Sequence, residues 1–307
     1  MTGKKLRIIF FGTPHYVLPV LDALEKTYDI VAVVTQEPKP VGRDQKLEYS
    51  PVDEWAHKKN IEKHFDFDNL PEAELGVCAS FGKIIPSEVL NYFKYGIINI
   101  HPSLLPKYRG SSPIQATLIE GINQTGVSII KMNEKLDQGH ILTQFKDDVL
   151  ENDDNQTLRD RLFEKSAEVL VEMIPNYIKG KITLKKQDES KVILTKEVKK
   201  DDAFIPFEIL KEVMTLNSGS SEMEFPFIKN QKYKVTASLI NNLIKAMKPW
   251  PYVWTKITTG NKEQRLKILK SHINNESGYL ELDEVQLEGK NPVSFKQFNS
   301  YYKIWQK

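Results

Sequence analysis

The chain has 307 residues, of which 40% are hydrophobic and 27% charged, a composition typical of a folded protein long enough for two domains. No stretch approaches the roughly 18 apolar residues of a membrane span, and the apolar run behind the basic start is too short for a signal peptide. The single cysteine, Cys78, excludes an internal disulfide and lies in an apolar run, which indicates a small buried side chain. We therefore expect a soluble cytoplasmic protein without a membrane partner.

The start of the chain predicts a strand, a turn and a helix. Residues 6–11 are apolar, Gly12-Thr13-Pro14 follow, and apolar residues then recur at helical spacing, with Thr13 as a candidate cap. Residues 30–35 form a second β-branched run, so strand, helix and strand imply a parallel crossover. A lone glycine after the first strand is not a dinucleotide fingerprint, and no nicotinamide cofactor is inferred.

Residues 36–51 form a long polar connection that contains three prolines and the basic residues Arg43 and Lys46. Loops longer than about 12 residues in compact domains are usually functional or disordered. A function in binding and ordinary surface solubility are both open for the two basic side chains.

The next buried strand is predicted at residues 75–80, followed by an apolar turn at residues 81–86 and a short helix at residues 88–93 capped by Ser87. A further strand at residues 96–100 brings Asn99 and His101 to its end at spacing i, i+2, so both leave the same face. Open α/β sheets bind their ligands at this carboxyl edge. Taken alone, the pair could also be polar groups that cap the following loop.

Four more elements complete the expected α/β domain: a helix at residues 113–120, strands at residues 125–132 and 140–145, and a long helix at residues 157–178. A loop with Asp137 and Gly139 joins the two strands, and the glycine lets it turn tightly. Runs of β-branched residues without polar alternation fit a sheet covered on both faces. The fold class is therefore a doubly wound, mostly parallel, Rossmann-like sheet.

The second half of the chain is the basic half. Residues 1–180 carry 21 basic and 26 acidic side chains, whereas residues 181–307 carry 22 and 15. Nine basic side chains and one acidic one fall within residues 231–270, which indicates either a surface that meets phosphate or a solvated lysine-rich face. Its predicted elements are a lysine-rich linker at residues 185–203, a helix at residues 236–247 and strands at residues 265–271, 278–284 and 293–298.

Residues 99–115, together with Leu136-Asp137-Gln138-Gly139, resemble the 10-formyltetrahydrofolate-dependent formyltransferases, and among them the branch that acts on initiator methionyl-tRNA. Residues 10–14, 40–43 and 50–52 match in the same order. The resemblance is strong to about residue 180 and thin afterwards, where a helix and a Pro-Trp-Pro motif match a small β-barrel related to the oligonucleotide-binding fold. It implies a catalytic domain at residues 1–184, a linker at 185–203 and a tRNA-binding domain at 204–307. Trp250 and Trp254 of the motif would by themselves be core residues.

The resemblance also implies the roles of individual residues in formyl transfer. Asn99 would donate to the oxyanion, His101 would handle the proton and Asp137 would orient His101. A metal is not expected, because a third ligand at recognisable spacing is missing. The folate-binding candidates are Ser103, Leu104, Leu105, Pro106, Phe81, Ile84 and Ile85, and the tRNA-binding candidates are Arg43, Lys46, Lys245 and Lys248.

The predicted function is transfer of the formyl group of 10-formyltetrahydrofolate to the amino group of methionine on initiator tRNA, by a monomer. An amino-sugar-nucleotide formyltransferase and a 10-formyltetrahydrofolate hydrolase share the same Asn, His and Asp set and remain alternatives. A glycinamide formyltransferase is disfavoured, because enzymes of that kind normally lack a second domain. An RNA-binding module with an inactive α/β half is the alternative from another class, against which the intact Asn99, His101 and Asp137 argue.

Overall fold

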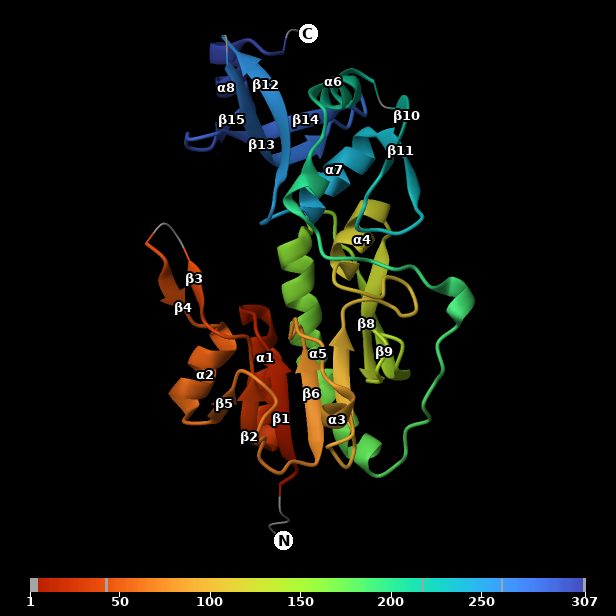
Figure 1. Cartoon of the computed structure of the whole chain (residues 1–307). Helices are drawn as coiled ribbons and strands as arrows, with labels where there is room; N and C mark the ends of the chain where they lie inside the picture. Colours follow the sequence, from red (N-terminus) through yellow and green to blue (C-terminus); the bar gives the residue numbers. More distant parts are fainter. Residues whose placement is uncertain (1–4, 42–43, 217, 261, 306–307) are drawn as a thin grey trace. The chain divides into compact units, whose positions relative to one another are not determined.

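The computed structural model describes residues 5–41, 44–216, 218–260 and 262–305 (Figure 1). The backbone forms two compact units, and each is built from three separate stretches of the chain. The first comprises Met1–Arg109, Gly126–Asp147 and Arg159–Val192, and the second comprises Gly110–Thr125, Asp148–Leu158 and Ile193–Lys307. The domain boundaries expected at residues 184 and 203 stay a prediction. Within the described residues, no helix is long and apolar enough to span a membrane.

A seven-stranded sheet with the order β5-β2-β1-β6-β7-β8-β9 is the centre of the first unit. The first five strands in this order pair in parallel, whereas β7 and β8 pair antiparallel. This confirms the mostly parallel α/β sheet, whose central strands are buried along their length because both faces are covered. The strands are β1 (Arg7–Gly12), β2 (Asp29–Val34), β5 (Glu62–His64), β6 (Leu75–Ala79), β7 (Ile97–His101), β8 (Gln124–Lys131) and β9 (His140–Asp148).

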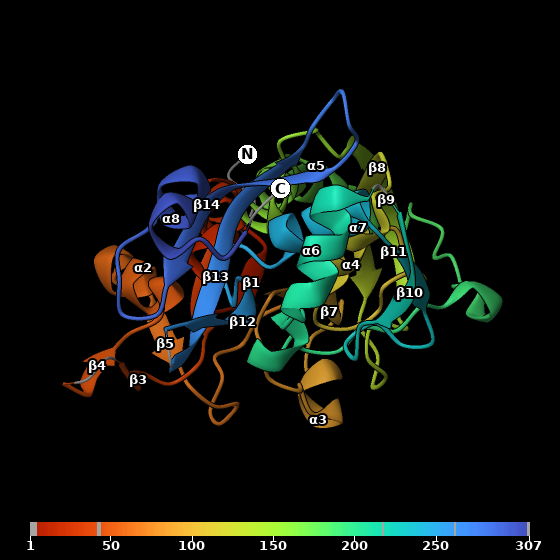
Figure 2. The ribbon, with the colours of Figure 1, turned by 90° about the horizontal axis from the view of Figure 1, so that it is seen from above.

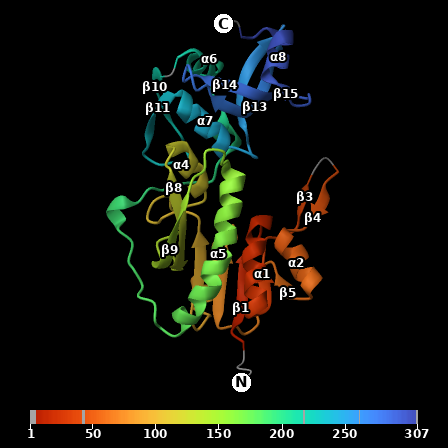
Figure 3. The same ribbon diagram turned by 180° about the vertical axis from the view of Figure 1, so that it is seen from behind.

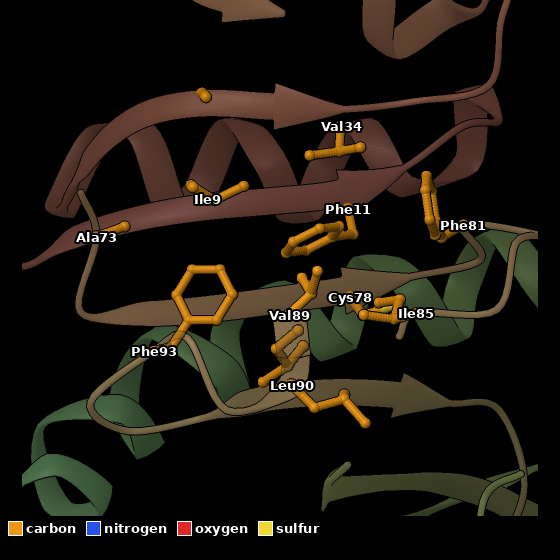
Figure 4. Close-up of a cluster of buried hydrophobic side chains, with 12 residues drawn as sticks. Ile9, Phe11, Val34, Ala73, Cys78, Phe81, Ile85, Val89, Leu90 and Phe93 are labelled. Carbon is orange, nitrogen blue, oxygen red and sulfur yellow. The ribbon is translucent and has the colours of Figure 1, made fainter. Parts of the chain in front are cut away.

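Helices α1 (Leu18–Thr27) and α5 (Asn155–Ile178) lie on one face of this sheet (Figure 3). The hydroxyl of Tyr28, at the end of α1, donates to the carbonyl oxygen of Val171 in α5 at 2.9 Å. On the other face, Ile9 and Phe11 of β1 enter an apolar cluster that includes the short helix α3 (Ser87–Leu90) (Figure 4). Helix α2 (Pro51–Lys59) begins after Ser50, whose side chain accepts from the amide of Asp53.

Two expected helix caps are wrong. Thr13 is too far from α1 to cap it, because the 3₁₀ turn η1 (His15–Val17) comes first, and its hydroxyl donates to the carbonyl oxygen of Phe81 at 2.9 Å instead. Ser87 is the first residue of α3, and the residue at the cap position is Pro86. The expected loop at residues 36–51 contains a small hairpin of β3 (Lys39–Val41) and β4 (Lys46–Glu48).

The second unit contains the antiparallel sheet β12-β13-β14-β15, a separate hairpin of β10 and β11, and the helices α4, α6, α7 and α8. Helix α7 packs against β13. The hydroxyl of Ser271 in β13 donates to the side chain of Asn241 in α7 at 2.8 Å. Figure 2 shows the ribbon of these elements from above. The elements are α4 (Pro113–Glu120), α6 (Phe207–Thr215), β10 (Ser218–Glu224), β11 (Lys232–Thr236), α7 (Ala237–Ala246), β12 (Val253–Thr259), β13 (Lys262–Ile273), β14 (Leu280–Leu287), β15 (Val293–Ser294) and α8 (Phe295–Tyr302).

The strand predicted at residues 293–298 is wrong beyond Ser294. The hydroxyl of Ser294 accepts from the amide of Gln297 and so caps α8. Phe298 is buried and stacks with Phe295 one turn earlier, so the aromatic residues follow a helical period and not an alternating one. Trp254 is buried as expected, whereas Trp250 is largely exposed and is not a core residue.

Candidate active site

The last strand of the parallel set carries two buried polar side chains at its carboxyl end. Asn99 and His101 of β7 are 9% and 4% exposed. The neighbouring strand ends are tied together at the same edge, because Thr13 after β1 and Gln36 after β2 both donate to the carbonyl oxygen of Phe81 after β6. The two side chains therefore lie at the sheet edge where α/β folds bind ligands.

Asp137 reaches this edge from the loop between β8 and β9. Its Oδ1 lies 3.5 Å from Nδ2 of Asn99, and its Oδ2 lies 3.6 Å from Nδ1 of His101. The structure thus brings together the three residues that the sequence analysis singled out. An amide nitrogen has two hydrogens, so Asn99 can donate toward Asp137 and also toward a ligand oxygen.

The second ring nitrogen of His101 fixes the protonation pattern of the imidazole. Nε2 lies 2.9 Å from the carbonyl oxygen of Tyr108. Because a carbonyl oxygen only accepts, Nε2 carries a hydrogen, and Nδ1 is the nitrogen that takes up or releases a proton. Nδ1 faces the carboxylate of Asp137, with 3.6 Å between Nδ1 and Oδ2.

The backbone of the loop that carries Asp137 is constrained at two positions, Asp137 and Gly139. Asp137 itself has φ +50°, a left-handed conformation that few residues other than glycine adopt. Gly139 packs so closely on the end of β8 that a Cβ atom there would lie 1.9 Å from the carbonyl oxygen of Lys131. The glycine signal in the sequence therefore reflects a close approach of two backbone segments.

Three residues that the sequence analysis assigned no role hold this loop. Gln187 donates from Nε2 to the carbonyl oxygens of Asp137 and Gly139 at 2.7 and 2.8 Å, and accepts from Nε of Arg109 at 2.9 Å. Both terminal nitrogens of Arg109 donate to Glu189, at 3.1 and 2.9 Å. Hydrogen bonds from Arg109 and Gln138 hold the pKa of Glu189 below its usual value. Gln187 and Glu189 lie in a lysine-rich stretch in which no periodicity or motif marks them.

The folate-binding candidates divide into buried and exposed side chains. Phe81 and Ile85 belong to the apolar cluster of the first unit (Figure 4), and Leu105 packs with Ile130 and Ile141. Ile84, in contrast, is 91% exposed, and Leu136 beside Asp137 is 72% exposed. The exposed apolar surface of Ile84 and Leu136 is accessible to a ligand, whereas the buried side chains support the backbone of their own segments.

The backbone of residues 103–106 is held rigidly by its neighbours. The hydroxyl of Ser103 donates to the carbonyl oxygen of Lys107 at 2.7 Å. The hydroxyl of Ser128 accepts from the amide of Leu105 and donates to the carbonyl oxygen of Ser103, while Gln144 donates to the carbonyl oxygen of Leu105. Leu104 and Pro106 are half-buried. A fixed loop of this kind suits a ligand that binds along it.

Cys78 of β6 is buried, as expected from its apolar surroundings. Burial, and secondly the charge of Asp137, raises the pKa of its thiol to about 12. The thiol therefore stays neutral near neutral pH and does not act as a nucleophile there. Among the described residues, no group of three or more His, Cys, Asp or Glu side chains could hold a metal ion.

The tRNA-binding candidates have different surroundings. Arg43 lies outside the described residues, and Lys46 is exposed in β4 of the hairpin. Lys245 donates to the carbonyl oxygen of Glu151 at 2.7 Å, and Lys248 lies 2.7 Å from Oδ2 of Asp154. Both of these lysines are thus engaged within the second unit.

Family models and sequence relatives of this chain agree on one family. The family model described as formyl transferase matches residues 4–174, and the model of the formyl transferase C-terminal domain matches residues 231–281. The methionyl-tRNA formyltransferase of Buchnera aphidicola is 32% identical over 98% of each chain.

Among solved structures, a sugar 3N-formyl transferase has a TM-score of 0.63 at 18% identity and covers 94% of this chain and 100% of its own. The methionyl-tRNA formyltransferase from Clostridium thermocellum has a TM-score of 0.55 at 17% identity, over 92% and 98%. At these identities the two structures support the fold alone, and the assignment rests on the family model and the sequence relatives. The chain belongs to the formyl transferase family, and within it to the methionyl-tRNA formyltransferases.

Proposed function

We propose that this protein transfers the formyl group of 10-formyltetrahydrofolate to the free amino group of methionine on initiator methionyl-tRNA. The observation that carries the proposal is the convergence of Asn99, His101 and Asp137 at one sheet edge, in a chain that aligns over its length with a methionyl-tRNA formyltransferase. The folate is a co-substrate that supplies an activated formyl group on nitrogen. Because the formyl group arrives activated, no covalent enzyme intermediate is needed.

Attack of the amine on the formyl carbon creates an oxyanion, which requires a hydrogen-bond donor. The side-chain amide of Asn99 supplies one, and a donor of this kind typically contributes about 2.7–4 kcal/mol to transition-state stabilisation. Its contact with Asp137 keeps the amide nitrogen, and not the amide oxygen, on the side of the reacting groups.

The reaction also moves a proton from the attacking nitrogen to the leaving one. We assign this transfer to His101 together with Asp137, at Nδ1 beside the Asp137 carboxylate, because Nε2 is committed to the carbonyl oxygen of Tyr108. Asp137 stabilises the imidazolium form and keeps the ring in place. The same arrangement can also accommodate a bound water that relays the proton.

For the folate, we assign the exposed apolar side chains of Ile84 and Leu136 to the pterin, with the rigid segment 103–106 along the rest of the molecule. For the tRNA, we assign Arg43 and Lys46 to the acceptor end and the basic stretch 231–270 to backbone phosphates. Since initiator tRNA is aminoacylated and used in the cytoplasm, we place the protein there. We also propose that it acts as a monomer.

The direct test is formylation in vitro. The protein is incubated with 10-formyltetrahydrofolate and initiator tRNA charged with radiolabelled methionine, and formylmethionine is quantified after mild hydrolysis of the ester. Uncharged tRNA and charged elongator methionine tRNA are the controls. Turnover on an amino-sugar nucleotide but not on charged tRNA, or release of formate without any acceptor, would contradict the proposal in favour of the two alternative enzymes.

A further inference from the structure

We infer that Gln187 is a positioning residue of the active site: with Arg109 and Glu189 it clamps the loop of Asp137 against the loop that follows His101. The inference rests on the proposed function for its catalytic readout, but the clamp itself is a structural claim. We name Arg109, Gln187 and Glu189 together the clamp.

Gln187 is 5% exposed and uses its side-chain amide fully. Both hydrogens of Nε2 go to the Asp137 loop, one to the carbonyl oxygen of Asp137 and one to that of Gly139. Its Oε1 accepts from Nε of Arg109. One buried amide therefore joins two segments that lie far apart in the sequence.

Arg109 connects Gln187 to the loop that follows β7. It comes directly after Tyr108, whose carbonyl oxygen accepts from Nε2 of His101. The guanidinium group is itself buried, and its charge is balanced by the paired hydrogen bonds to Glu189. Bidentate pairing fixes the plane of the guanidinium and thereby the direction of its Nε–H toward Gln187.

The clamp thus holds the backbone on both sides of the contact between His101 and Asp137. On one side it fixes Arg109 next to Tyr108, and on the other it fixes the carbonyl group of Asp137 itself. Asp137 needs such support because its φ of +50° is a conformation that persists only where the surroundings determine it. Without Gln187, the carboxylate would lose its fixed distance from Nδ1 of His101.

Hydrogen exchange in the substrate-free protein tests the clamp independently of the activity. We compare the wild type with Gln187→Leu, which keeps an approximately similar volume but has no polar atoms. Gln124→Leu is the matched control, because the amide of Gln124 donates to Asp148 on an exposed part of the second unit. Faster exchange in the peptide that covers residues 133–140, in Gln187→Leu only, is the expected result. Unchanged exchange in that peptide overturns the inference.

Kinetics then separate positioning from general stability. Gln187→Leu should lower kcat by about 10- to 100-fold, the usual effect of losing a group that orients a reacting side chain, with little change in the KM for folate. In an Asp137→Ala background the same substitution should change kcat less than about twofold, because Gln187 acts through Asp137. Equal losses in both backgrounds would show that Gln187 acts elsewhere and would overturn the inference.

Glu189→Gln provides a second variant in case Gln187→Leu does not fold. Glu189 is half exposed, and glutamine keeps an oxygen that can accept from the guanidinium of Arg109, so the substitution removes the negative charge and one of the two acceptors but not the whole contact. It should change exchange and kcat in the same direction as Gln187→Leu but less strongly, and no change in either would count against the clamp. If the wild type does not formylate charged tRNA at all, the proposed function fails, and the exchange experiment still decides whether the clamp exists.

Discussion

Nδ1 of His101 lies 3.6 Å from Oδ2 of Asp137, although His101 ends β7 and Asp137 lies in the loop that leaves β8 near the opposite end of β7. Strand β8 runs against β7, so His101 pairs with Ser128 while the far end of β8, Lys131, pairs with Ile98. The loop after β8 must therefore fold back along β7 to bring Asp137 to the site. The contact between the two side chains therefore depends on this return path of the loop.

The first prediction concerns the three converging side chains. Asn99→Ala should lower kcat by about 10²- to 10³-fold, since it removes a donor to the oxyanion. His101→Ala and Asp137→Ala should each lower kcat by about 10²- to 10⁴-fold, and the double variant should be little worse than the poorer single variant, because both act in one proton transfer. Single-turnover rates measure this.

Asn91→Ala is the matched control for Asn99→Ala. The amide of Asn91 donates to an oxygen as that of Asn99 does, here the carbonyl oxygen of Ser87, but Asn91 is exposed and outside the site. It should leave kcat unchanged. Near-normal turnover by His101→Ala would refute the assignment of the proton transfer.

Neighbouring isoleucines provide the second prediction. Ile84→Ala should leave the free energy of unfolding within about 0.5 kcal/mol of the wild type, because the side chain is exposed, but should raise the KM for folate about tenfold if the pterin buries it. Ile85→Ala should instead lower the free energy of unfolding by about 2–5 kcal/mol, since Ile85 is buried in the apolar cluster. Denaturant unfolding and folate titration distinguish the two. An unchanged KM in Ile84→Ala would remove Ile84 from the folate site.

The third prediction concerns the return path of the Asp137 loop. Gly139→Ala places a Cβ atom against the carbonyl oxygen of Lys131, so the loop must shift and kcat should fall about 10²-fold. Gly180→Ala is the control, because its φ of +66° is strained for alanine but no atom lies within 4 Å of the added Cβ. It should lose about 1–2 kcal/mol of stability and no activity. Full activity of Gly139→Ala would mean that the loop tolerates the displacement.

Two basic residues of the polar stretch 36–51, Arg43 and Lys46, carry the fourth prediction. Arg43→Ala and Lys46→Ala should each raise the KM for charged tRNA and leave the KM for folate unchanged. Each should also reduce the slope of log affinity against log salt by about 1, as expected for the loss of one phosphate contact. Lys58→Ala, on the exposed side of α2, is the control. A parallel loss of folate and tRNA affinity would indicate that the stretch 36–51 has a structural role.

Lysines of the second unit carry the fifth prediction. If about four basic side chains within residues 231–270 neutralise phosphates, the log–log salt slope of tRNA binding should be near −3. Lys245→Glu with Lys248→Glu should flatten that slope and raise the KM for tRNA while kcat is nearly kept, and Lys296→Glu is the control outside the stretch.

Both lysines also have partners within the second unit, so stability has to be measured in the same variants. Lys248 pairs with Asp154, whose Oδ1 accepts from the amide of Thr157 at the start of α5. A lowered free energy of unfolding with an unchanged salt slope would show that the two lysines serve folding and not tRNA binding.

The sequence by itself determined the elements that repeat a local pattern. Runs of β-branched residues predicted the buried strands β1, β2, β6, β7 and β8, because a strand covered on both faces needs no polar alternation. The spacing of Asn99 and His101 predicted that both would lie at the carboxyl end of β7, since side chains two positions apart leave a strand on the same face. Pro113 at the first position and Gly121 after the last one predicted the two ends of α4.

Only the tertiary structure decided which distant groups meet. Gln187 lies in a stretch that reads as a linker, yet its amide supports Asp137, because hydrogen bonds from a side chain to a remote backbone carbonyl leave no periodicity in the sequence. Thr13 has the residue type and position of a helix cap, yet its hydroxyl donates to the carbonyl oxygen of Phe81. A short polar side chain can satisfy itself locally or across the fold, and only the positions of the neighbouring strands select between the two.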